Sequence, residues 1–144
     1  MRIFRALATG ACALFVIFFL AVGPAFSARQ YFSHISLDVP EGWKAFEQGQ
    51  TVAVTADDGS SSVTITIDAH DNVALKQRAT NASRQLGGAL PVWDGESYVF
   101  TFVNPNGLVG AVVIGDREDG NYLLVVVIGD NPGIHYISQT IEDY

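Results

Sequence analysis

Residues 122–128 read YLLVVVI, an uninterrupted run of apolar side chains. Successive side chains of a β-strand point to opposite faces of its sheet, so a strand with this sequence is apolar on both faces. Such a strand has to be covered on both sides, unlike a strand with one solvated face. The run therefore predicts a central strand that lies between two packing layers.

Two segments have the helical spacing that supplies such layers. Apolar side chains within residues 72–86 fall on one stripe of a helix, and Gly87-Gly88 follows its last turn. Residues 132–144 repeat the pattern, with a proline at the start. The candidate N-caps are Asp71 and Asn72 for the first helix and Asp130 and Asn131 for the second.

Most other segments alternate between apolar and polar residues, which is the pattern of half-buried strands. Turn signals separate them, such as Asp57-Asp58-Gly59 and Asn104-Pro105-Asn106-Gly107, and short turns join strands as antiparallel hairpins. The predicted strands are 31–39, 51–55, 62–68, 95–103, 109–115 and 122–128, with a short extra strand near 91–94. The fold class is α+β, a mostly antiparallel sheet of about six strands with two main helices packed on it.

Residues 1–27 have the layout of a secretory signal peptide. Two arginines precede a continuous apolar stretch, residues 6–22, and a Gly-Pro break is followed by small residues. Ala25 and Ser27 fit the small-residue subsites of signal peptidase, so we predict cleavage between Ser27 and Ala28. The mature protein is then periplasmic or secreted. The alternative is an uncleaved segment that anchors the N-terminus in the inner membrane.

Residues 28–144 form the predicted mature domain, and no linker divides them. The formal net charge of −7 becomes −9 when the two arginines of the signal are removed, so nucleic acid is not an expected partner. The same charge disfavours a membrane surface, unless the signal stays uncleaved. The only cysteine, Cys12, leaves with the signal, which excludes disulfides and thiolate sites from the mature domain.

Four stretches of the chain resemble those of a known superfamily: ISLDVPEGW at 35–43, DDGSSSVTITI at 57–67, ALKQRATNASRQL at 74–86 and GNYLLVVVIGD at 120–130. Their order resembles the Mog1/PsbP-like superfamily, especially small exported bacterial members of unknown function. The resemblance implies an α/β/α sandwich. It also implies protein binding, since members bind a small GTPase or photosystem subunits, and it carries no shared active site.

Few residues are candidates for a site. Asp68, His70 and Asp71 have the spacing to contribute ligands to a divalent cation, but no further ligand is signalled, and a solvated loop with a helix cap is the favoured interpretation. An exposed Trp93, beside a proline, would indicate a binding surface.

No nucleophile elbow, phosphate-binding loop or EF-hand spacing occurs, so we expect no catalytic residues, cofactor or metal. The expected function is that of an exported, non-catalytic domain that binds another envelope protein or assists assembly of an envelope complex. The alternative is a small metal-dependent binder or enzyme that uses His70 and neighbouring carboxylates.

Overall fold

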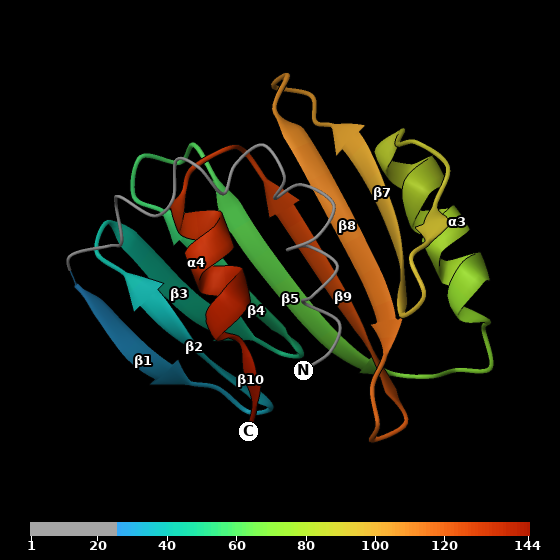
Figure 1. Ribbon diagram of the computed structural model, residues 1–144, viewed down its shortest axis with the longest axis horizontal. Coiled ribbons are helices and arrows are strands. Elements are labelled where there is room, and N and C mark those ends of the chain that lie inside the picture. The colour runs from blue at the N-terminus through green and yellow to red at the C-terminus, as the bar shows by residue number, and fades with distance from the viewer. Residues whose placement is uncertain (1–25) are drawn as a thin grey trace.

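The computed structural model describes residues 26–144 (Figure 1). The predicted signal peptide lies outside this part of the chain, except for its last two residues. Within the described part, the chain forms two antiparallel sheets and two helices. The larger sheet contains, in spatial order, β3 (Trp43–Gln48), β4 (Thr51–Ala56), β5 (Ser62–Ala69), β9 (Asn121–Ile128), β8 (Val109–Asp116), β7 (Ser97–Val103) and β6 (Val92–Trp93). The smaller sheet has the order β1 (Ser27–Tyr31), β2 (Ile35–Pro40) and β10 (Glu142–Asp143).

Strand β9 lies inside the larger sheet, between β5 and β8, and its apolar side chains divide between the two faces. The buried set is Leu123, Val125 and Val127, and the partly buried set is Tyr122, Leu124, Val126 and Ile128. The sequence prediction of a central strand with cover on both sides is therefore confirmed.

One face of the larger sheet is covered by the smaller sheet and by α4 (Gly133–Thr140). Side chains from β2, such as Leu37, and Ile137 from α4 are fully buried there together with Leu123. In Figure 1, α4 lies in front of β5 and beside β2. We call this side of the larger sheet the front face.

The opposite, back face is covered by α3 (Leu75–Leu86), which lies beside β7 in Figure 1. The helix buries Ala79 against the phenylalanine rings of β7, Phe100 and Phe102, and against side chains of β8. It ends at Gly87, whose φ of 64° is a left-handed conformation that glycine adopts readily. Because the helices pack on opposite faces, the chain has the predicted α+β class with helical layers on both sides.

The sheet prediction is wrong in size, because ten strands form two sheets where about six strands in one sheet were expected. Residues 31–39 are not one strand: β1 and β2 form a hairpin, and the backbone N–H of Phe32 donates to the carbonyl of Ile35 across its turn. No glycine or proline marks this turn, so the alternation continues through it. Strand β3 was missed, because it is an edge strand with mostly exposed side chains.

The helix ends also differ from the prediction. Helix α3 starts at Leu75 with Ala74 at the N-cap and no side-chain cap, so neither Asp71 nor Asn72 caps it. Pro132 is the N-cap of α4, so neither Asp130 nor Asn131 occupies that position, but the Oδ1 of Asn131 accepts from the backbone N–H of Gly133 at 2.9 Å just before the helix.

Helix α4 stops at Thr140 rather than continuing to residue 144. The carbonyl of Thr140 accepts from Arg29 at 2.6 Å. Ile141 is extended and buried, and β10 then pairs with β2.

On each face of the larger sheet, the packed elements cover about half of the strands and leave the other half without a helix. Helix α4 and the smaller sheet lie over the β3–β4–β5–β9 half of the front face, whereas α3 contacts β7 and β8 on the back face. The front of β6–β7–β8 and the back of β3–β4–β5 are therefore not covered by the described helices (Figure 1). These two open half-faces differ in chemistry, since the back one is rich in threonine and the front one in valine.

Candidate functional site

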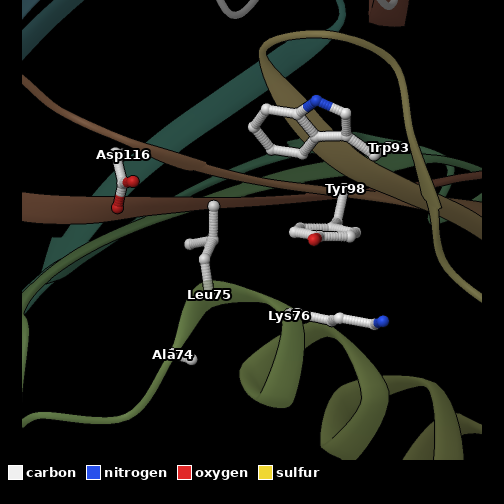
Figure 2. A pocket seen from close by; sticks show the side chains of 6 residues that line it. All are labelled: Ala74, Leu75, Lys76, Trp93, Tyr98 and Asp116. Carbon is white, nitrogen blue, oxygen red and sulfur yellow. The ribbon is translucent and has the colours of Figure 1, made fainter.

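An open groove of about 350 Å³ lies where the start of α3 meets the back of β6, β7 and β8 (Figure 2). Trp93 of β6 and Tyr98 of β7 provide aromatic rings, and Leu75 of α3 provides an apolar contact between Tyr98 and Asp116. The complete lining is Ala74, Leu75, Lys76, Trp93, Tyr98 and Asp116. The groove therefore combines aromatic surface with one cationic and one anionic side chain.

Trp93 is positioned by the turn that joins β6 to β7. Its ring packs on Tyr98, directly opposite in the strand register, with centroids 4.9 Å apart and planes tilted by 53°. This contact leaves half of Trp93 (50%) exposed. The short extra strand near 91–94 is thus present as β6.

Asp94 holds this turn in place. Its carboxylate accepts hydrogen bonds from the backbone N–H groups of Glu96 and Ser97, at 2.9 and 2.8 Å, and from the Ser97 hydroxyl at 3.1 Å. Burial by itself raises the pKa of Asp94, but these donors outweigh it, and the pKa is lowered overall. The ionised side chain therefore fixes the backbone next to Trp93.

The opposite wall of the groove contains Asp116, the last residue of β8. Its Oδ1 lies 2.5 Å from His70 Nε2, and the imidazole also packs against the ring of Tyr122 with centroids 5.7 Å apart. His70 thus comes from the loop before α3 to hold a carboxylate of the groove in place. The sequence prediction had singled out His70 and Trp93 separately, and the fold brings them to the same region.

The remaining metal candidates have other partners. Asp71 pairs with Arg78, whose guanidinium lies 4.1 Å above the ring of Tyr122. Asp68 accepts a hydrogen bond from the backbone N–H of Ala69 at 2.8 Å. Residues 26–144 contain no group of three or more His, Cys, Asp or Glu side chains that could hold a metal ion.

The groove also contains residues that the sequence reading did not select, namely Leu75, Lys76, Tyr98 and Asp116. Tyr98 faces Trp93 because the turn between them is short, so an inferred hairpin register across Asp94-Gly95-Glu96 would have paired the two aromatics. Asp116 stands at the end of β8, next to the turn that leads to β9. Nothing in the local sequence links it to α3, because that proximity is tertiary.

A second exposed feature lies on the open half of the front face. Val92, Val103 and Val109 are 66%, 59% and 61% exposed, and strand register places them on one face of β6, β7 and β8. Two partly buried neighbours, Val99 and Ala111, connect them to the front core. We call these five residues the valine surface: Val92, Val99, Val103, Val109 and Ala111.

The predicted turn Asp57-Asp58-Gly59 joins β4 to β5 as a hairpin, and a second acidic turn, which contains Asp119, joins β8 to β9. Asp58 accepts from the hydroxyl and the backbone N–H of Ser60, at 2.6 and 2.9 Å, and these bonds lower its pKa. The pKa of Asp119 is lowered first by the side chain of Arg117 and then by the backbone N–H of Asn121. Both carboxylates stabilise their own turns.

The bond between Ser27 and Ala28, the predicted cleavage point, lies in β1, where these residues pair with Pro40 and Val39. None of the helices in residues 26–144 is long and apolar enough to cross a membrane.

No protein-family profile matches this chain. No curated protein matches it either. The solution structure of cyanobacterial PsbP (CyanoP) from Synechocystis sp. PCC 6803 is similar, with a TM-score of 0.55 and 12% identity over 86% of this chain and 96% of that one. A crystal structure from Bacteroides thetaiotaomicron VPI-5482 aligns with a TM-score of 0.46 and 14% identity over 76% of this chain. The chain spans 45% of that second protein. Sequence, topology and the similarity to CyanoP agree: the chain has a PsbP/Mog1-like fold.

Proposed function

We propose that this protein is an exported, non-catalytic domain that binds another envelope protein through its valine surface. The observation that carries the proposal is the group of three valines that are each more than half exposed on one face of adjacent strands. Exposed apolar side chains that gather on one face favour a protein contact, because leaving them in water costs free energy that a partner recovers.

The arrangement of the core supports this role. Residues of the valine surface lie on the same sheet face as the front core, and Val99 and Ala111 already pack against that core. A partner placed there would extend the cover that α4 and the smaller sheet provide over the other half. The larger sheet is thereby a rigid platform for the contact. The PsbP/Mog1-like fold fits a binding or assembly role.

The proposal is tested by site-specific photocrosslinking in cells that express the full chain. A photoreactive phenylalanine analogue replaces Val103 in one strain and Thr64, on the open back face, in the matched control. We expect one discrete adduct from position 103 and none from position 64. A second substitution, Val109→Asp, should abolish the adduct by placing a charge in the contact.

The crosslinking experiment needs a control for folding of the variant. Val109 is exposed, so Val109→Asp should leave thermal unfolding nearly unchanged, which circular dichroism verifies. Absence of any adduct from position 103, or equal adducts from both positions, would exclude the valine surface as the contact.

Export is tested separately. We expect that the protein from the envelope fraction starts at Ala28, as measured by intact mass, and a mass that includes residues 1–27 would contradict export with cleavage.

A further inference from the structure

The aromatic groove is separate from the valine surface. Strand β6 carries Val92 toward the front face and Trp93 toward the back, so the two features lie on opposite sides of the same edge. The groove also differs in composition, because it contains two aromatic rings and two opposite charges, whereas the valine surface is aliphatic. A separate ligand is therefore expected for it.

The charges of the groove restrict that ligand. Asp116 and Lys76 lie on opposite sides of Leu75 and Tyr98 (Figure 2). One is an anion and one a cation, so the groove attracts neither sign of net charge strongly. A carboxylate only accepts hydrogen bonds and an ammonium only donates them. The preferred ligand is neutral and offers both donors and acceptors.

The aromatic rings add a second restriction. Trp93 packs on Tyr98, and half of the residue is exposed. The face of an aromatic ring is electron-rich and attracts groups with partial positive charge, such as polarised C–H bonds. The ligand must therefore carry a flat C–H surface beside its polar groups. Sugars of the glucose configuration have both, since their hydroxyls are equatorial and their axial C–H bonds form an apolar face.

We propose that this groove binds a neutral oligosaccharide of glucose or N-acetylglucosamine units. One sugar ring stacks on Trp93, hydroxyls of a neighbouring ring donate to Asp116, and another hydroxyl or an acetamide oxygen accepts from Lys76. His70 keeps the Asp116 carboxylate in place through their 2.5 Å contact. Asp94 fixes the turn that presents Trp93.

A proline-rich peptide is the other occupant that aromatic grooves commonly select. Proline has no backbone N–H, so such a segment supplies few donors, and Asp116 would lose contact with water without gaining a partner. A sugar provides several hydroxyl donors along each ring. The chemistry of the groove therefore favours the carbohydrate.

The test is a titration of the purified protein with chitotriose, cellotriose and maltotriose, with the heat of binding measured by isothermal titration calorimetry. We expect saturable binding of at least one trisaccharide, and Trp93→Ala should weaken it by up to about tenfold, the order of one stacking contact. Phe46→Ala is the matched control, because Phe46 is also a half-exposed aromatic (54%) but lies on β3 at the other edge of the sheet. It should leave the affinity unchanged.

Asp116→Ala should also weaken binding, whereas thermal unfolding of each variant verifies that the fold is retained. No binding of any of the three trisaccharides at millimolar concentration would overturn the proposal. Equal affinities of the wild type and Trp93→Ala, or binding of a decaproline peptide in place of the sugars, would overturn it too. The valine-surface crosslink does not depend on Trp93, so the two proposals fail separately.

Discussion

Leu123 and Leu124 are neighbours in β9 whose side chains lie on opposite faces of the larger sheet. Leu123→Ala and Leu124→Ala therefore remove the same atoms from two different environments. Leu123 is fully buried (0% exposed) in the front core, beneath the smaller sheet and α4. Leu124 is only partly buried, because it lies between the region under α3 and the open back of β5, where it pairs with Thr66.

The burial of each leucine determines how much its truncation should lower the free energy of unfolding. Truncating leucine to alanine loses about 2.4 kcal/mol of transfer free energy when the side chain is completely buried, at about 0.8 kcal/mol per methylene. A sealed site adds a cavity contribution, which brings Leu123→Ala to about 3–5 kcal/mol. At Leu124, part of the side chain already contacts water and the site opens to solvent, so we expect about 1–2 kcal/mol.

Urea denaturation monitored by circular dichroism measures both changes, with the slope of each transition verifying two-state unfolding. We expect a clearly lower midpoint for Leu123→Ala than for Leu124→Ala. Equal costs, or a greater cost at Leu124, would refute the reasoning, because the open half of the back face would then be as well sealed as the front core.

Two other predictions concern the site and its support. Asp94 has a lowered folded-state pKa, so its stabilising contribution is complete above the unfolded value of about 3.9 and is lost as pH falls through the folded value. Asp94→Ala should cost about 1 kcal/mol at neutral pH and flatten the acid side of a melting-temperature profile, and an unchanged profile would contradict this. A Cβ at Gly110 would lie 2.4 Å from the Phe102 ring, so Gly110→Ala should destabilise by about 1–3 kcal/mol in urea. The double variant with Phe102→Leu should recover part of that loss, and strictly additive costs would show that the ring is not the cause.

Local sequence patterns predict many of the strands and turns. The alternation in residues 62–68 and the Asn-Pro-Asn-Gly turn after β7 each predict an element that the structure contains. These signals succeed because strand alternation and turn propensity act between residues that are close in the chain. The same locality explains the failure at residues 31–39, where the hairpin turn contains neither glycine nor proline.

The candidate site depends much less on local signals. His70 and Asp116 are 46 positions apart and meet because β5 and β8 both pair with β9. The end of α4 was misjudged for a related reason. Apolar spacing continues to residue 144, but the Arg29 guanidinium donates a hydrogen bond to the Thr140 carbonyl, and the chain leaves the helix there to pair with β2.

The YLLVVVI run at residues 122–128 separates what the sequence determines from what the tertiary structure decides. By itself it determined that the protein has a central strand with cover on both faces, because alternating side chains that are all apolar leave no face for water. Only the tertiary structure decided that the front cover is a second sheet with α4, and that each cover leaves half a face open. Hydrophobic burial is not directional, so a sequence can require cover without specifying which segment provides it.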